Sequence, residues 1–350
     1  MIFSVEHVII KVRKSIFNLL IRLRNFNLVK HAVILTVGSL SHRSQLTYNR
    51  AHSMLPALGK PLVIRIMDRL YRVGIRHYTV VVGENEGAVV NYLNTQWMPD
   101  VTVNYILKFP NDSFVKTIKT IAQKINEPFI VCSYNSFTHT HFPEALLNHY
   151  EENPDVLLFS GASNTLSQAP QHVFAVTESD VVKEIVTAST PEKRALTLID
   201  FFVCGAPVVE YIMKLSDQAT YQESNRQFMD IAKRYIENGG KGIMTRANWV
   251  LQVEADRDLL TLNKHLLDEG HDAHILSELP YTVKIIPPVR IDPQVNVGQG
   301  AKIGPHVYLE RGASVGHEVV LKDCIVLTKA NVPSQKTLTG TILTTRGSLT

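Results

Sequence analysis

The sequence predicts an α/β fold, in which a mostly parallel sheet with helices on both faces is followed by a short left-handed parallel β-helix. Two observations lead to this prediction. Apolar segments rich in β-branched residues alternate with helical patterns from residue 32 to about 267, and a six-residue aliphatic repeat begins after residue 288. The 350 residues, 45% of them hydrophobic, are enough for one large and one smaller core.

The first of these regions alternates strands and helices in the way that builds a Rossmann-like sheet. Strands are predicted for residues 31–37, 77–83, 101–107, 128–134 and 155–161, and helices for residues 60–73, 86–94, 114–125 and 143–151. In such sheets ligands bind beyond the carboxyl ends of the strands. The loops that follow residues 37 and 132 are therefore where chemistry is expected.

The six-residue repeat is the most specific pattern in the chain. The first slot of each hexad holds Ile291, Val297, Ile303, Leu309, Val315, Leu321 and Leu327, and the second slot, four residues later, holds Val295, Ala301, Val307, Ala313, Val319, Ile325 and then Asn331. A parallel β-helix needs this pattern because its faces stack aliphatic side chains and its inner corners admit small ones. The predicted organisation is a basic helix at 1–30, the α/β domain at 31–286, the β-helix at 287–332 and a C-terminal tail at 333–350.

Charge and cysteine content narrow the class of protein. The net charge is +4, but the first thirty residues hold six Lys and Arg against Glu6, so the remainder carries 30 basic and 31 acidic residues. A nucleic-acid-binding protein would place its basic excess on a folded face, so no nucleic-acid partner is expected. Cys132, Cys204 and Cys324 are far apart and form no C-x-x-C pair, which disfavours a disulfide framework or a zinc site and favours the cytoplasm.

The first thirty residues form an amphipathic basic pattern. At helical spacing, one side carries Val5, Ile9, Val12, Ile16, Leu19 and Leu23, and the other carries Lys11, Lys14, Asn18 and Arg22. Such a helix suits the surface of an anionic membrane, which would make the protein peripheral to a membrane. The alternatives are a helix packed on the domain or on a partner chain, or a start codon placed too early.

One segment between the first predicted strand and helix identifies a family. Leu55-Pro56-Ala57-Leu58-Gly59-Lys60-Pro61 matches the L-P-x-x-G-K-P segment of the sugar-1-phosphate nucleotidyltransferases, and the chain resembles that family from about residue 32 to 327. The resemblance implies a reaction in which a sugar phosphate attacks the α-phosphorus of a nucleoside triphosphate and expels pyrophosphate. Catalysis there consists mostly of positioning and neutralising phosphates.

The phosphate-binding loop of that family, G-x-G-T-R, is altered in this chain. Gly38 and Ser39 begin the loop, and Leu40, Ser41 and His42 stand at the second glycine, the threonine and the arginine; Ala51-His52 stands at a following P-K pair. Leu40 brings a Cβ where the backbone approaches phosphate, and His42 and His52 are mostly neutral at pH 7. Arg43 lies one residue from the position of the arginine.

Three further positions of the family pattern are also altered. Ser113 stands at the base-recognition glycine. Asn135 and Gln252 fall at the two aspartates that the resemblance implies for Mg²⁺. Two amides in place of two carboxylates remove the anionic oxygens that Mg²⁺ prefers. No cofactor is therefore expected with certainty, and Mg²⁺ only if the site is active.

The sequence therefore supports three hypotheses of function. The first is a nucleotidyltransferase-like protein with an eroded site that binds a nucleotide or nucleotide sugar, as a homo-oligomer or as the regulatory partner of an active paralogue. The second is an active transferase with a rearranged site, in which Arg43 replaces the arginine and Asp112 or another acid supplies the metal ligand. The third is an oligomeric scaffold without catalytic function.

Overall fold

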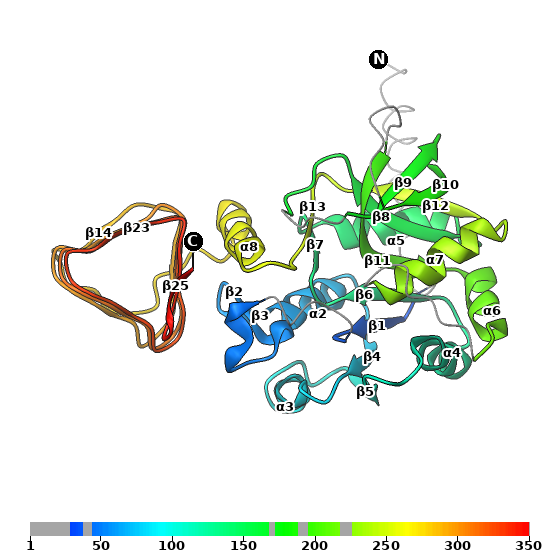
Figure 1. Cartoon of the computed structure of the whole chain (residues 1–350), viewed down its shortest axis with the longest axis horizontal. Helices are drawn as coiled ribbons and strands as arrows, with labels where there is room; N and C mark the ends of the chain where they lie inside the picture. The colour runs from blue at the N-terminus through cyan, green and yellow to red at the C-terminus, as the bar shows by residue number, and fades with distance from the viewer. Residues whose placement is uncertain (1–28, 38–43, 168–171, 188–194, 218–225, 350) are drawn as a thin grey trace, which may run out of the picture.

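The computed structural model describes residues 29–37, 44–167, 172–187, 195–217 and 226–349. Its larger part is built on a nine-stranded sheet of order β5-β4-β1-β6-β11-β8-β12-β10-β9 (Figure 1). The strands are β1 (His31–Leu35), β4 (His77–Val82), β5 (Thr102–Leu107), β6 (Phe129–Ser133), β8 (Leu157–Ala162), β9 (Phe174–Glu178), β10 (Val181–Val186), β11 (Ala195–Cys204) and β12 (Gly242–Arg246). In the described sheet, β10 and β11 run against the other strands, so the predicted mostly parallel sheet is confirmed.

Helices cover both faces of this sheet, as the alternating pattern predicts. One face is covered by α2 (Leu62–Arg72), α3 (Gly87–Thr95) and α5 (Phe142–Glu152), and the other by α4 (Phe114–Ile125), α6 (Ala206–Lys214) and α7 (Gln227–Glu237). The last helix, α8 (Asp256–Asp268), shares the core of the first set. Each set packs its apolar side chains into a separate core. These buried faces account for the continuous hydrophobic runs of the central strands, because a strand covered on both sides has no polar face.

Several short elements lie outside the nine-stranded sheet. They are η1 (Gln45–Tyr48), η2 (His52–Met54), the hairpin β2 (Pro56–Ala57) and β3 (Lys60–Pro61), and the antiparallel pair β7 (Ser136–Thr138) and β13 (Val250–Gln252). The pairing of β7 with β13 brings the segment that follows β6 close to the segment that precedes α8.

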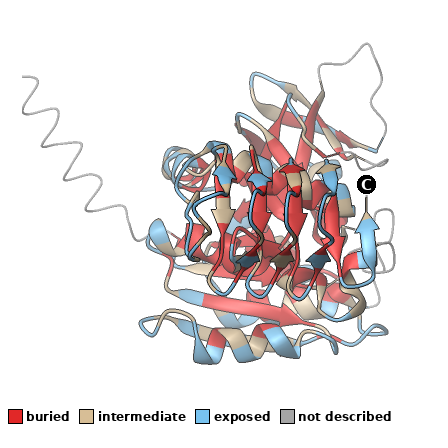
Figure 2. Cartoon of the chain, turned by 90° about the vertical axis from the view of Figure 1, so that its left-hand side faces the viewer, coloured by how far each residue is buried: buried red, intermediate tan, exposed pale blue. Residues whose placement is uncertain are grey.

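The C-terminal part is a parallel β-helix with three sheets, seen along its axis in Figure 1. Its strands are β14 (Lys284–Ile285), β15 (Val289–Ile291), β16 (Asn296–Val297), β17 (Lys302–Ile303), β18 (Val307–Leu309), β19 (Ser314–Val315), β20 (Val320–Lys322), β21 (Cys324–Val326), β22 (Asn331–Val332), β23 (Thr337–Thr339), β24 (Ile342–Thr344) and β25 (Gly347–Leu349). Figure 2 looks onto this β-helix, whose strands lie side by side and are largely buried. Because β23 and β24 add a further rung, the β-helix extends into the segment predicted as a tail.

The repeat loses one residue in its last third. Val289 pairs with Val307, 18 residues later, whereas Val307 pairs with Cys324, only 17 residues later. Val326 and not Leu327 is therefore in register with Leu309 and packs inside the β-helix. The hexad assignment of Ile325, Leu327 and Asn331 is thus wrong by one position.

Four apolar side chains of the β-helix face the other domain. Leu327, Ile325, Tyr308 and Ile342 belong to the same core as α2 and α8. The β-helix therefore shares a continuous hydrophobic core with the α/β domain, with α8 lying between the two in Figure 1.

The predicted amphipathic arm at 1–30 falls almost entirely outside the described residues, and its contact with a membrane stays a prediction. Among the described helices, none combines the length and the apolar character required to cross a bilayer.

Candidate functional site

The carboxyl edge of the sheet, where β1, β4 and β6 end, is the candidate site. Six of the predicted site residues lie outside the described residues: Gly38, Ser39, Leu40, Ser41, His42 and Arg43. The others, His52, Ser113, Asn135 and Gln252, are described. Two of these four are brought into direct contact.

Asn135 and Gln252 form a hydrogen-bonded pair of amides. Gln252 pairs with Ser136 across β7 and β13, and its Nε2 donates to Asn135 Oδ1 at 2.8 Å. Asn135 Oδ1 also accepts a hydrogen bond from Ser133 Oγ at 2.7 Å, and Asn135 Nδ2 donates to the carbonyl of Val253 at 3.0 Å. Both side chains are buried. The structure thus places the two altered positions next to each other.

An arginine side chain that the sequence motifs do not mark completes this cluster. Arg226, at the N-terminus of α7, donates from Nη2 to Gln252 Oε1 at 2.9 Å and to the carbonyl of Leu198 at 3.1 Å. Its Nε lies 3.2 Å from Asp200 Oδ2. Burial raises the pKa of Asp200, and the charge of Arg226 opposes this shift. The cluster therefore holds one buried ion pair beside two neutral amides.

These donors do not fit the Mg²⁺ ion that the resemblance implies. An amide oxygen has two lone pairs. Asn135 Oδ1 accepts from Ser133 and Gln252, and Gln252 Oε1 accepts from Ser136 Oγ at 2.9 Å and from Arg226. Both oxygens are neutral and already hydrogen-bonded, and a guanidinium lies against one of them, so the hard anionic ligands that Mg²⁺ requires are missing here.

His52 lies in a buried position that keeps its ring neutral. Its Nδ1 shares a hydrogen bond of 2.9 Å with Tyr134 Oη, and Tyr134 directly precedes Asn135. Burial lowers the pKa of His52 to about 4, against a smaller opposing effect of Asp256. At neutral pH this residue therefore supplies no positive charge for a phosphate.

Ser113 and the neighbouring Asp112 have local structural roles. Ser113 is the N-cap of α4, and its Oγ accepts from the amide of Lys116 at 3.4 Å. Asp112 Oδ2 accepts from the amide of Phe109 at 2.8 Å within the preceding turn. The hydrogen bonds of Ser113 lie within the first turn of α4, so the structure does not join it to the amide pair.

The segment that matches the family pattern most fully lies at the junction of the two domains. Leu58 and Gly59 have positive φ angles of 48° and 78° and form the tip of the β2–β3 hairpin. The amide of Gly59 donates to Tyr308 Oη of the β-helix at 3.0 Å, and the amide of Leu58 donates to Asn263 Oδ1 of α8 at 2.9 Å. A Cβ on Gly59 would lie 2.4 Å from the guanidinium of Arg290. The positive φ favours glycine at this position, and the guanidinium of Arg290 would have to move for any larger residue.

A second retained residue fixes the start of α8. Asp258 is fully buried, and its Oδ2 accepts from the amides of Glu254 and Ala255 at 3.0 and 2.8 Å. Such a contact satisfies free amides at a helix N-terminus. The retained residues Gly59 and Asp258 thus have structural roles, whereas the altered Asn135 and Gln252 meet beyond the end of β6.

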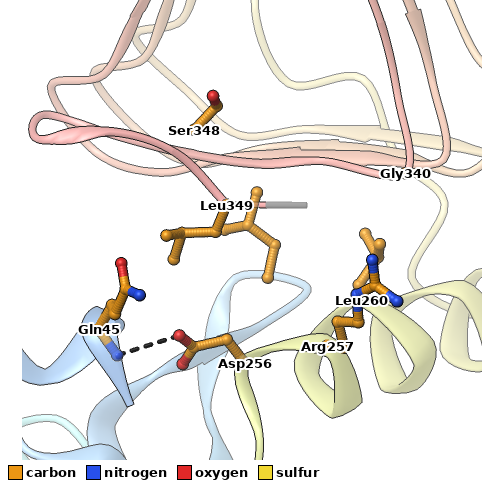
Figure 3. A pocket seen from close by; sticks show the side chains of 8 residues that line it. Gln45, Asp256, Arg257, Leu260, Gly340, Ser348 and Leu349 are labelled. Carbon is orange, nitrogen blue, oxygen red and sulfur yellow. Dashed lines mark hydrogen bonds between the residues drawn. The ribbon is translucent and has the colours of Figure 1, made fainter. Parts of the chain in front are cut away.

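Helix α8 also contacts the residues that follow the predicted phosphate-binding loop. Asp256 accepts from Ser44 Oγ at 2.6 Å and from the amide of Gln45 at 3.0 Å (Figure 3). A cleft of about 350 Å³ lies above this contact, between α8 and the C-terminal strands, and is lined by Gln45, Asp256, Arg257, Leu260, Gly340, Ile342, Ser348 and Leu349. Tyr48 Oη and Thr345 Oγ1 lie 2.6 Å apart beside it. α8 and the C-terminal strands therefore contact residues 44–48, which follow the predicted phosphate-binding loop in the sequence.

Similar structures share the α/β fold at low sequence identity. A glucose-1-phosphate thymidylyltransferase from Bacillus anthracis matches at TM-score 0.55 and 16% identity, covering 67% of this chain and 93% of that one. A UDP-glucose pyrophosphorylase in complex with UDP-glucose matches at TM-score 0.57 and 14% identity, covering 69% and 99%. An inositol-1-phosphate CTP transferase from T. maritima matches at TM-score 0.53 and 13% identity, covering 68% and 97%.

Sequence comparisons cover both domains. The bifunctional protein GlmU of Exiguobacterium sp. is 28% identical over 126 residues, which are 35% of this chain and 26% of that protein, so the match spans about a quarter of the relative. The GMPPB C-terminal domain matches residues 285–349. The nucleotidyl transferase family matches residues 31–250, most of the α/β domain. This chain therefore belongs to the nucleotidyl transferase family.

Proposed function

We propose that this chain is a nucleotidyl transferase family member with an eroded catalytic site, which binds a nucleotide sugar as a sensor or regulatory subunit. The observation that carries this proposal is the hydrogen-bonded pair of Asn135 and Gln252 beside Arg226. Nucleotidyl transfer needs concentrated positive charge on the triphosphate as pyrophosphate leaves. The pair offers no anionic oxygen to hold a divalent ion, and His52 is neutral.

The ligand class follows from what the fold keeps. The carboxyl edge of the sheet is the usual place for a nucleotide in this architecture. One of the similar structures holds UDP-glucose. A nucleotide sugar already contains the phosphoanhydride bond that the transfer reaction would make between the nucleoside phosphate and the sugar phosphate, so it needs recognition and no catalysis.

Two measurements on the purified full chain test this proposal. Pyrophosphate release from each nucleoside triphosphate with a panel of sugar 1-phosphates and Mg²⁺ should not exceed the protein-free blank. In a thermal-shift panel, one nucleotide sugar should raise the Tm by several degrees, because a ligand at 100 times its Kd adds about 2.7 kcal/mol to the stability of the folded state.

Free sugar and free nucleoside monophosphate are the matched control ligands. Pyrophosphate release above the blank would support an active enzyme instead. A panel in which no nucleotide sugar changes the Tm would leave the scaffold hypothesis.

A further inference from the structure

We infer that Arg226 is a built-in cation that excludes a divalent metal from the carboxyl-edge site, so that any ligand there is bound without metal. The inference concerns the same site as the proposed function, and only its statement about a ligand rests on that function. Its basis is that a guanidinium is held against one of the two amides that replace the family's metal-binding aspartates.

The guanidinium is held by three acceptors. Arg226 contacts Gln252 Oε1 on β13, the carbonyl of Leu198 on β11 and Asp200 Oδ2 on the same strand, at 2.9, 3.1 and 3.2 Å. The side chains of Arg226 and Asp200 are only about a tenth exposed. A buried ion pair of this kind is costly to break from one side, because the remaining charge is left without its partner. The positive charge is therefore fixed.

The charges of Asn135, Gln252, Arg226 and Asp200 balance without a metal, and the nearby Asp230 adds a negative charge that raises the pKa of Asp200. Two carboxylates and a divalent ion together carry no net charge, and the same holds for two neutral amides with one arginine and one aspartate. A divalent ion added to this cluster would lie beside a fixed positive charge and would find no unshared anionic oxygen on Asn135 or Gln252. Both effects disfavour the metal.

This arrangement implies that restoring the carboxylates alone does not restore a metal site. Gln252→Glu is isosteric, and the oxygen that now accepts from Arg226 Nη2 would become anionic. The new carboxylate would form an ion pair with the guanidinium, in which both partners are charged, whereas in the present hydrogen bond only the donor is charged. In N135D/Q252E the carboxylate at position 252 would thus be paired with Arg226, which leaves only the carboxylate at position 135 unpaired.

The test is Mn²⁺ binding to the full chain, followed by electron paramagnetic resonance, with no nucleotide present. We expect N135D/Q252E to bind Mn²⁺ no more tightly than the wild type, and N135D/Q252E/R226Q to bind it at least tenfold more tightly. R226Q/D200N keeps both amides and removes both charges, and as the matched control it should not bind. Equal Mn²⁺ affinity of the double and triple variants would overturn the inference.

A second measurement covers the case in which the triple variant does not fold. Urea unfolding in EDTA compares wild type, Q252E, R226Q and Q252E/R226Q and gives the coupling between positions 226 and 252. Q252E loses the hydrogen bond from Gln252 Nε2 to Asn135 Oδ1, and the inference predicts that it is less destabilising with Arg226 present than without it. Absence of coupling would contradict it. Because no nucleotide is used, failure here is distinguishable from failure of the proposed function, which the nucleotide-sugar panel reports.

Discussion

At the scale of single residues, His52 illustrates how a charged position becomes a neutral one. It stands where the family resemblance implies a lysine, yet its ring is buried and hydrogen-bonded to Tyr134. Burial disfavours the charged form, which lowers the pKa to about 4. The ring therefore serves packing and hydrogen bonding, and protonating it would place a charge in a buried position.

The low pKa of His52 should destabilise the folded chain in mild acid. The pKa of His52 is lower in the folded chain than in the unfolded chain, so the unfolded state binds a proton first as the pH falls through about 6.5. Between pH 7.5 and 5 the wild type should lose about 2 kcal/mol of unfolding free energy from this residue alone. Urea unfolding of wild type and His52→Gln at both pH values measures the difference. Equal losses in the two proteins would show that His52 titrates normally.

Residues could be singled out from the sequence where a motif existed. Asn135 and Gln252 could be assigned to one site because each lies at a fixed offset from a recognisable segment, and the structure places them 2.8 Å apart. Arg226 and Asp200 could not be predicted, because they lie in no motif and meet Gln252 only through the tertiary fold. Ser113 aligns with a base-recognition position of the family, and in the structure it caps a helix.

At the scale of elements, the β-helix shows how a one-residue deletion stays hidden in a repeat. The missing residue lies between Lys322 and Cys324, where the register changes from 18 to 17 residues per coil. Leu327 is aliphatic and so continued the sequence pattern, although the structure turns it toward the α/β domain. The period predicted the architecture correctly, and only the pairing of neighbouring coils could reveal the shift.

The corrected register can be tested by two neighbouring substitutions. Ala330 lies inside the β-helix and is 1% exposed, whereas Asn331 is exposed. Ala330→Leu should cost about 1–3 kcal/mol, because the interior has no room for the added atoms, and Asn331→Leu should change the unfolding free energy by less than about 0.5 kcal/mol. Chemical denaturation of both variants measures this. If Asn331→Leu cost more unfolding free energy than Ala330→Leu, the uninterrupted hexad register would be correct instead.

At the scale of the whole molecule, the retained family segment joins the two domains. The hairpin tip at Leu58 and Gly59 contacts α8 and the β-helix, and Tyr308 is fully buried between the domains. Tyr308 Oη accepts from the amide of Gly59 and donates to Asp292 Oδ2 at 2.8 Å. These contacts explain why this segment keeps its sequence while the catalytic positions change.

Tyr308→Phe isolates this junction. The variant keeps the ring in the shared core but leaves the Gly59 amide and one Asp292 oxygen without this partner, which should cost about 1–3 kcal/mol of unfolding free energy. Tyr281→Phe is the matched control, because that side chain is 97% exposed and should change nothing measurable. Equal stabilities of the two variants would mean that the junction contributes little to the fold.

We propose that the carboxyl-edge site binds a nucleotide sugar without a divalent metal. The most direct measurement is isothermal titration calorimetry of the full chain with a panel of nucleotide sugars, UDP-glucose among them, once in EDTA and once in Mg²⁺. We predict that one nucleotide sugar binds with the same affinity, within about twofold, in EDTA and in Mg²⁺. Binding that requires Mg²⁺ would contradict it, since the amide pair and Arg226 would then not exclude the metal.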